Sequence, residues 1–327
     1  YTDGILNLTN VTVSGNSADL GGGGIQATGD STPTISSSTI TGNEADADGD
    51  GTGNGGGVFG GDTVTLRNTI IAGNIDRTAG SGDSDECSGN VVSATHSILG
   101  HAGGCSYTTG PGDQVGTPAS PLDPMLAPIA DNGGPTQTHA LLVGSPAVDA
   151  GDAGSPGSGG NACPATDQRG FPRGPCDIGA YELVLCGTVP VNRIGSDGDD
   201  VLTGTDGADG FLAQGGDDTV NALGGDDGVC LGDGNDTADA GAGNDVVSGE
   251  GGNDIALGGA GKDTASGGPG KDRLAGGGGK DRLKGEAGKD KLRGQGGKDR
   301  LRGGPGKDTC NGGPGKDKAV CEKERKV

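Results

Sequence analysis

Apolar residues in the first third of the chain recur in two columns. When Gly15-Asn16, Gly42-Asn43 and Gly73-Asn74 are aligned, each Asn is preceded at fixed distances by two apolar residues, first Leu8, Ile35 or Leu66 and then Val13, Ile40 or Ile71. The two columns are an odd number of residues apart, so a straight strand cannot point both inward. A bend is therefore expected at Asn10, Ser37 and Asn68, because Asn tolerates the left-handed conformation. Residues 1–110 are predicted to form stacked coils of short parallel strands, with an antiparallel sandwich as the alternative.

A second pattern begins at Gly195, where a strict nine-residue period continues through fourteen repeats to residue 320. Position 4 is Gly and position 6 is Asp in every repeat, and position 8 is usually apolar, as at Leu202, Val220 and Leu274. Positions 7 to 9 fit a short strand with position 8 pointing into the core. Glycine allows the first six residues to turn tightly with carbonyl groups facing inward.

Composition alone would indicate disorder, because the chain contains 76 Gly and has a net charge of -22. The periods favour a solenoid, which buries only a thin column of side chains in each turn. No apolar run is long enough for a transmembrane helix. The first residues already fit a strand, so we expect a fragment whose export signal lies in a missing N-terminal part. The short charged tail, residues 321–327, differs from tails read by type I secretion systems.

The position-6 carboxylates are the candidate metal ligands. Ca²⁺ prefers six to eight oxygen ligands, which carboxylates and backbone carbonyls can supply together. The spacing resembles the G-G-x-G-x-D-x-U-x pattern of RTX, or hemolysin-type, repeats. The resemblance implies two repeats per turn, stacking of Asp residues 18 apart, and several Ca²⁺ ions between turns. The ligands it implies are Asp200, Asp209, Asp218, Asp227, Asp236, Asp245, Asp254, Asp263, Asp272, Asp281, Asp290, Asp299, Asp308 and Asp317. A flexible Gly/Asp-rich tail is the alternative.

Charge divides the repeats into two halves. Residues 195–261, here the acidic half, hold fifteen acidic and no basic side chains, whereas residues 262–320, the basic half, hold fifteen basic and eight acidic ones. Position 5 is Lys throughout the basic half. A nearby ammonium opposes a divalent cation, so we expect weaker calcium binding there, with Lys and Arg pairing with Asp on neighbouring turns. Alternatively, these cations only adjust solubility, or they hold anionic surface polymers.

Between the two patterns, residues 111–182 contain recognisable motifs. Asp131-Asn132-Gly133-Gly134-Pro135, Gly144-Ser145-Pro146-Ala147, Asp167-Gln168-Arg169-Gly170 and Asp177-Ile178-Gly179-Ala180-Tyr181-Glu182 resemble a choice-of-anchor Q domain. The coils of residues 1–110 resemble right-handed parallel β-helix proteins of bacterial surfaces. Together these resemblances imply export and surface display. The expected fold is all-β: a β-helix fragment, its anchor-type end, a linker at 183–194 and a calcium-bound parallel β-roll at 195–320.

The eight cysteines are too scattered for a zinc pattern and fit disulfides in an oxidising compartment. Cys163 and Cys176 flank the Asp167–Gly170 turn and are expected to pair. Cys310 with Cys321 would clamp the last repeats, and Cys87 with Cys105 is expected. That leaves Cys186 and Cys230 to tie the linker to the early roll. Reduced structural cysteines are the alternative.

Other candidate sites are weaker. His96, His101 and His139 are scattered, and no order of residues suggests a catalytic triad. The run from Asp46 to Gly51 resembles the start of an EF-hand loop, but Gly57 stands where the closing Glu is needed. Asn-x-Thr triplets at Asn7, Asn10 and Asn235 would need a eukaryotic secretory route and are discounted.

The favoured function is a secreted or surface-displayed calcium-binding structural protein with an adhesive role. Its partners would be calcium and a cell-surface or extracellular polysaccharide, with no nucleic acid. The alternative is a polysaccharide lyase or hydrolase that uses a groove on the β-helix. Such a lyase needs a base beside clustered carboxylates, and Arg67 is the one plausible base.

Overall fold

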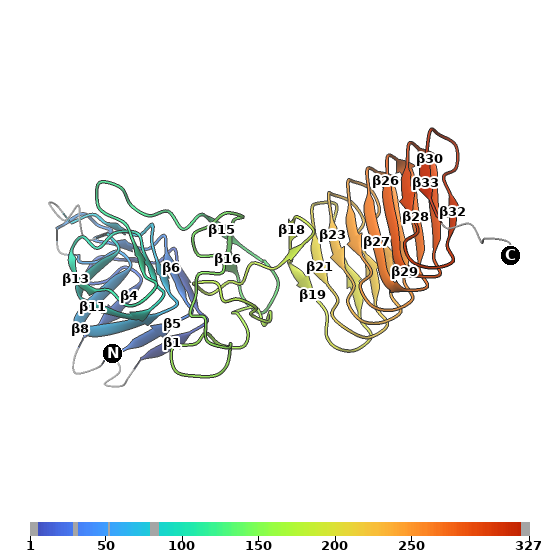
Figure 1. Cartoon of the computed structure of the whole chain (residues 1–327). Helices are drawn as coiled ribbons and strands as arrows, with labels where there is room; N and C mark the ends of the chain where they lie inside the picture. Colours follow the sequence, from blue (N-terminus) through green and yellow to red (C-terminus); the bar gives the residue numbers. More distant parts are fainter. Residues whose placement is uncertain (1–5, 29–31, 52, 79–84, 322–327) are drawn as a thin grey trace. The chain divides into compact units, whose positions relative to one another are not determined.

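The computed structural model describes residues 6–28, 32–51, 53–78 and 85–321, apart from the side chain of Asp62. All regular secondary structure in these ranges is β. The described residues include no helix with the length and apolar character needed to cross a membrane. The chain divides into two compact units, one ending at Leu183 and the other beginning at Val184 (Figure 1). Of the predicted charged tail, residues 322–327 lie outside the described residues.

The first unit is built on three sheets of parallel strands. The first sheet contains β4 (Ile25–Ala27) and, in order, β1 (Asn7–Thr9), β5 (Thr34–Ser36), β8 (Val58–Arg67), β11 (Cys87–Thr95) and β13 (Cys105–Thr108). The second contains β2 (Thr12–Ser14), β6 (Thr39–Thr41), β9 (Ile70–Ile71), β12 (Ile98–Leu99) and β14 (Gln114–Val115). The third contains β3 (Ser17–Ala18), β7 (Glu44–Ala45) and β10 (Ile75–Asp76). The chain therefore passes from sheet to sheet in stacked coils.

The predicted register of these coils is confirmed. Ile35 pairs with Leu8 on one side and Leu66 on the other, and Ile40 pairs in the same way with Val13 and Ile71. The bend between the two columns is confirmed as well, because Asn10, Ser37 and Asn68 have φ of 55°, 45° and 46°. A further coil bends at His96, with φ of 42°. This coil lies outside the alignment of the three Gly-Asn pairs.

The corner after the second sheet is held by a ladder of amides, exposed at Asn16 and buried at Asn43 and Asn74. Asn16 Nδ2 donates to Asn43 Oδ1, and Asn43 Nδ2 donates to Asn74 Oδ1, both at 2.9 Å. The ladder ends on a carboxylate, since Asn74 Nδ2 donates to Glu86 Oε2 at 2.8 Å. Burial raises the pKa of Glu86 to about 7. The aligned Gly-Asn pairs are thus the hydrogen-bonded corners of successive coils.

Residues that follow these coils cover one side of the first unit. Strands β15 (Leu126–Ala130) and β16 (Thr138–Leu141) form an antiparallel pair. Leu141, Ile178 and Tyr181 pack in one buried cluster with Ile70 and Ile98 from the second parallel sheet. The segment with anchor-type motifs therefore shares a core with the coils.

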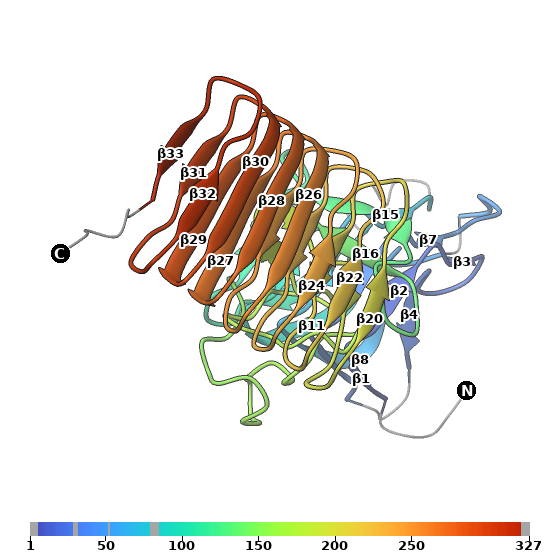
Figure 2. The ribbon, with the colours of Figure 1, turned by 90° about the vertical axis from the view of Figure 1, so that its right-hand side faces the viewer.

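The second unit is a roll of two parallel sheets, each receiving every other repeat. One contains β19 (Arg193–Ile194), β21 (Gly210–Leu212), β23 (Gly228–Cys230), β25 (Val246–Ser248), β27 (Thr264–Gly270), β29 (Arg282–Gly288), β31 (Arg300–Arg302) and β33 (Lys318–Val320). The other, labelled along its length in Figure 2, contains β20 (Val201–Thr203), β22 (Thr219–Asn221), β24 (Thr237–Asp239), β26 (Ile255–Gly261), β28 (Arg273–Gly279), β30 (Lys291–Gly297) and β32 (Thr309–Asn311).

Position 8 of the repeats lies in the core of the roll, as predicted, together with position 1 of four repeats, as at Leu231. The buried cluster runs from Phe211 through Val229 and Val247 to Leu301, with Leu202 and Cys310 packed at its ends. Residues 183–194, expected to be a linker, contain strands instead. Strands β17 (Leu185–Cys186) and β18 (Val189–Pro190) form a hairpin. Strand β19 pairs with β21 in the eight-stranded sheet of the roll. The roll therefore begins before Gly195.

Candidate metal centre

The turn before each strand depends on glycine at position 4. In Gly234 and Gly252 φ is 152° and 140°, a conformation that other residues rarely adopt. A Cβ at Gly234 would also collide with the carbonyl oxygen of Gly216, one turn earlier in the stack. Both constraints recur along the repeats, so neighbouring turns can approach closely at this point.

Position 6 places its carboxylates in two continuous columns, one for each series of alternate repeats. The backbone N–H of Asp218 donates to Oδ1 of Asp236 at 2.7 Å, and the N–H of Asp236 donates to Oδ1 of Asp254 at 3.0 Å. The same bond joins Asp200 to Asp218 and Asp299 to Asp317, at 2.8 and 2.9 Å. The predicted stacking of Asp residues 18 apart is confirmed. Their role as metal ligands stays a prediction.

The second oxygen of most of these carboxylates has no hydrogen-bond partner. Among the described residues, a buried and unpartnered Oδ2 occurs in Asp218, Asp227, Asp236, Asp245, Asp254, Asp263, Asp272, Asp281, Asp290, Asp299 and Asp308. Buried polar atoms are normally satisfied, and an unpaired buried oxygen costs free energy. A repeated row of such atoms is what a bound cation would complete.

Backbone oxygens lie beside the unpartnered carboxylate oxygens. A Cβ at Gly258, position 1 of its repeat, would lie 2.6 Å from both Asp263 Oδ2 and the carbonyl oxygen of Gly276, one turn on. Carboxylate and carbonyl oxygens thus face the same small space between turns. An all-oxygen set of this kind suits Ca²⁺, so the residues present fit the ion.

When no ion is bound, the pKa of several carboxyl groups in the columns is raised. Burial, assisted by the carboxylates one turn away and opposed by the backbone hydrogen bond, raises the pKa of Asp245 and Asp254 to about 7. The pKa of Asp227, Asp263 and Asp272 is raised to about 6, again chiefly by burial. A divalent cation would favour the ionised form of these groups and remove this penalty.

The first two position-6 carboxylates differ from the rest. Asp200 Oδ2 accepts hydrogen bonds from the backbone and the hydroxyl of Ser196, and Asp209 Oδ2 does the same with Thr205. Arg193 lies 3.2 Å from Asp209 Oδ1. Protein donors thus satisfy Oδ2 of these two carboxylates, which therefore lack the unpartnered oxygen of the later repeats.

Position 5 distinguishes the two halves of the roll. In the acidic half its side chains form an exposed ladder, in which the N–H of Asn235 donates to Asp217 Oδ1 and the N–H of Asn253 donates to Asn235 Oδ1. In the basic half the N–H of Lys289 donates instead to the carbonyl oxygen of Gly270 at 3.2 Å. The position-4 carbonyls there have a protein donor.

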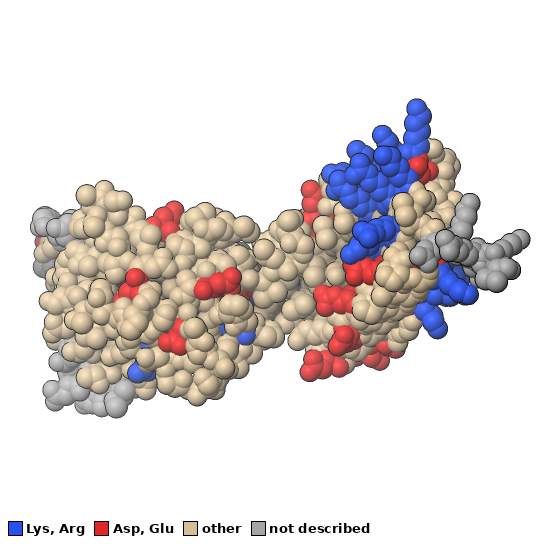
Figure 3. Space-filling view, viewed as in Figure 1, with Lys and Arg blue, Asp and Glu red and all other residues tan. Residues whose placement is uncertain are grey.

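The expected pairing of Lys and Arg with position-6 Asp is wrong for the interior of the basic half. Among the described residues, Oδ2 of Asp272, Asp281 and Asp290 has no partner, while Oδ1 accepts a backbone N–H. The carboxylates point between the turns, whereas the Lys and Arg side chains point outward and are exposed. Figure 3 shows these cations gathered over the later turns.

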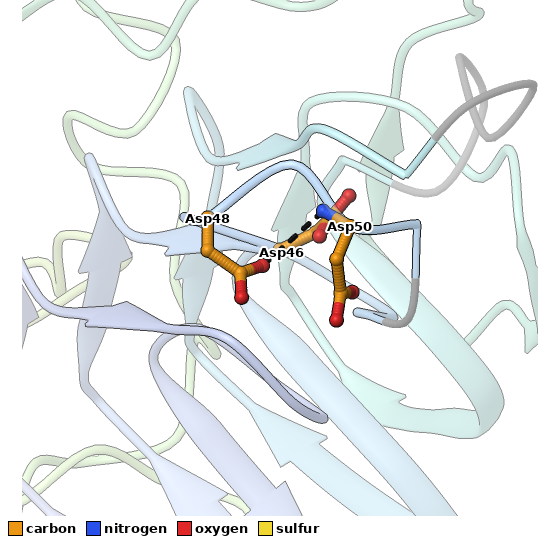
Figure 4. Close-up of side chains that lie close together, drawn as sticks. All are labelled: Asp46, Asp48 and Asp50. Carbon is orange, nitrogen blue, oxygen red and sulfur yellow. Dashed lines mark hydrogen bonds between the residues drawn. The ribbon is translucent and has the colours of Figure 1, made fainter.

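The EF-hand-like run in the first unit brings three carboxylates together (Figure 4). Oxygens of Asp46, Asp48 and Asp50 lie within 4.8 Å of one another. Both oxygens of the buried Asp46 already accept the N–H of Gly51, at 3.1 Å each. The cluster is a tight acidic turn, and no unpartnered buried oxygen singles it out as a site.

The residues weighed for catalysis are dispersed. Arg67 ends β8, pairs along the sheet with Ser36 and Thr95, and forms no ion pair with a described carboxylate. His139 is held by Ser14 Oγ at 2.7 Å and by the carbonyl oxygen of Ala127 at 2.8 Å. His96 lies near Asp152, and His101 near Asp85, in both cases at 3.7 Å. The three histidines therefore belong to separate contacts.

The anchor-type motifs form a buried ionic cluster. The guanidinium of Arg169 lies between the rings of Phe171 and Tyr181, at 3.7 and 3.6 Å from their centres, and pairs with Asp167. Arg173 Nη1 donates to Glu182 Oε2 at 2.9 Å. These contacts use most of the charged residues in the motifs to hold the covering segment in place.

The four expected disulfides are all present: Cys87–Cys105, Cys163–Cys176, Cys186–Cys230 and Cys310–Cys321. Sequence reasoning missed two features. Position 2 of the repeats has positive φ even where it is Gln214 or Glu250, and its frequent Gly was the available signal. It also missed Glu86, whose position before β11 gave no periodic signal.

Comparison with known proteins agrees with this geometry. A family model described as RTX calcium-binding nonapeptide repeat (four copies) matches residues 194–229, 232–265, 257–292, 266–301 and 285–319. A search of the curated proteins and a search of the solved structures found no match to this chain. Residues 194–229 and 232–319 of the second unit are therefore RTX calcium-binding nonapeptide repeats.

Proposed function

We propose that this protein is a secreted or surface-displayed structural protein with an adhesive role, whose C-terminal repeats fold when they bind Ca²⁺. The observation that carries the proposal is the row of buried, unpartnered Oδ2 atoms between successive turns. A protein that folded without an ion would leave each of these oxygens unsatisfied.

Coupling between calcium binding and folding follows from the charge of the acidic half. Its fifteen acidic side chains have no basic residue among them. Its apolar core is thin, and several position-8 residues are only Ala, such as Ala238 and Ala256. Because that core cannot offset the repulsion, the free energy of binding becomes free energy of folding. Extracellular modules bind Ca²⁺ with dissociation constants of roughly 10⁻⁴ to 10⁻³ M.

The role of the first unit is proposed on its form and its motifs. Stacked coils of parallel strands support a right-handed parallel β-helix in residues 1–110, ended by a choice-of-anchor Q-like segment in 111–182. Four disulfides support an oxidising, extracellular location. The unit would display the calcium-binding roll at a cell surface, with a polysaccharide as partner.

Calcium titration of the whole chain tests the proposal. Far-UV circular dichroism should show a gain of β structure at millimolar Ca²⁺ that a chelator reverses. Mg²⁺ is the control ion, since it demands octahedral geometry and dehydrates reluctantly. A β signal that is complete without Ca²⁺ and unchanged by it would contradict coupled folding.

A further inference from the structure

A groove lined by cations crosses the outer face of the sheet formed by β26, β28 and β30. It has a volume of about 230 Å³ and is lined by Ile255, Leu257, Arg273, Leu274, Ala275, Lys291 and Arg293. Apart from Leu274 at the inward position 8, the lining comes from repeat positions 7 and 9, which point outward. The groove therefore runs between two columns of side chains and crosses successive strands.

The cations of the groove are available to a ligand. Arg273 pairs in register with Lys291, and Ala275 with Arg293, so the three cations lie on adjacent strands about 4.8 Å apart. All three side chains are exposed. No salt bridge to them is present among the residues that the structure describes.

The carboxylates nearest in sequence do not neutralise this surface. Asp272 and Asp290 directly precede Arg273 and Lys291, but they are 1% and 0% exposed and belong to the column between the turns. Outward positions in the acidic half carry groups such as Thr219, Thr237 and Asp239 instead. Positive charge is thus concentrated at one end of the roll (Figure 3).

We propose that this groove binds a linear acidic polysaccharide, with carboxylate or sulfate groups paired to Arg273, Lys291 and Arg293. The apolar part of the lining, Ile255 and Leu257, would contact the carbon faces of the sugar rings. Leu257 is 39% exposed. The inference rests on the adhesive part of the proposed function and gives its partner a chemical class.

The observations favour a glycan over nucleic acid. Proteins that bind single strands stack bases on aromatic side chains, and residues 262–320 contain no aromatic residue. The concave shape also favours a chain-like ligand over the flat surface of a membrane. Periodic cations on a rigid sheet match a polymer that repeats its charge along its length.

Binding of chondroitin sulfate to the full chain at millimolar Ca²⁺ tests the inference. The triple substitution Arg273→Gln, Lys291→Gln and Arg293→Gln should weaken binding by about tenfold. The matched control, Arg282→Gln, Arg300→Gln and Lys318→Gln, removes the same charge from the opposite sheet and should weaken binding by less than about threefold. Leu257→Ser should weaken binding with no change in charge. Circular dichroism with Ca²⁺ checks that each variant is folded.

Three results would overturn the inference. Equal losses in the two triple variants would show diffuse attraction without a groove. Binding of a single-stranded DNA of similar charge as tightly as the glycan would assign the surface to nucleic acid. Absence of glycan binding, with calcium uptake intact, would refute this inference and leave the calcium proposal standing. Failure of the unsubstituted chain to bind calcium would refute the proposed function itself.

Discussion

The acidic and basic halves of the roll share one backbone design and differ on their surfaces. Both stack position-6 carboxylates 18 residues apart, as Asp218 on Asp236 and Asp272 on Asp290. Both leave the second oxygen of those carboxylates buried and unpartnered. The outward positions, by contrast, change from acidic and neutral to basic. The buried positions, which are the proposed calcium ligands, are thus alike in the two halves, while the exposed positions differ.

Removing calcium should produce the largest difference between the halves. We expect the acidic half to lose its β structure in a chelator, because fifteen acidic side chains repel without compensation. The basic half has fifteen basic side chains to offset the repulsion among its eight acidic ones, so it should retain more structure. Limited proteolysis of the full chain, followed by mass spectrometry, would locate the cuts. Preferential cutting within 262–320 would reverse the comparison.

Substituting one buried position-6 carboxylate in each half should show how far the two halves differ in calcium affinity. Asp245→Asn removes a carboxylate from the acidic half and should lower calcium affinity at its site by about tenfold, or about 1.4 kcal/mol. Asp290→Asn should have a smaller effect in the basic half. Asp239→Asn is the matched control, since Asp239 is exposed at position 9. Isothermal titration calorimetry would compare the three, and an equal loss for Asp239→Asn would show that only net charge matters.

Acid should partly replace calcium. Without the ion, burial raises the pKa of Asp245 and Asp254 from 3.8 to about 7. Because the pKa is higher in the folded than in the unfolded chain, protonation of these carboxyls stabilises the fold fully at a pH below the unfolded-state pKa. This contribution is lost as the pH rises through the folded-state pKa of about 7. The calcium-free roll should therefore melt at a higher temperature at pH 5 than at pH 8. The opposite order in thermal melts with chelator would contradict the pKa assignment.

Restoring the position-5 ladder should have the smallest effect. Lys271→Asn and Lys289→Asn would continue the column that now ends at Asn253. Removing two exposed ammonium groups should raise calcium affinity severalfold at most, under about 1 kcal/mol per site. Arg282→Gln with Arg300→Gln serves as the charge-matched control on outward positions. Equal gains in the two variants would show that position 5 has no special influence on the ion.

Periodicity explains which features could be predicted from the sequence. Each repeat position occurs many times in the same environment, so its residue preference is visible in the sequence. The stacking of Asp218 on Asp236 and the inward side chain of Val220 could therefore be predicted. The coil register of Ile35 and Ile40 followed for the same reason. Three of the disulfides followed from cysteines placed near one another in the chain, and Cys186–Cys230 followed because these two cysteines were left over.

Features that occur once could not be predicted in this way. The joining of β19 to the roll depends on Val191 and Cys186 being buried, and nothing periodic marks residues 184–194. The direction of the basic side chains also depends on which face of the strand each position occupies. For that reason ion pairs with Asp were expected where the structure turns Lys and Arg outward.

Hydrogen–deuterium exchange of the full chain with and without Ca²⁺ tests the central claim most directly, because it reports on each segment separately. The account predicts rapid exchange across residues 195–261 without calcium and strong protection at millimolar Ca²⁺. The first unit, with its own core, should change little, and the basic half should change less than the acidic half. Full protection of residues 195–261 without calcium would contradict the claim that binding the ion folds the roll.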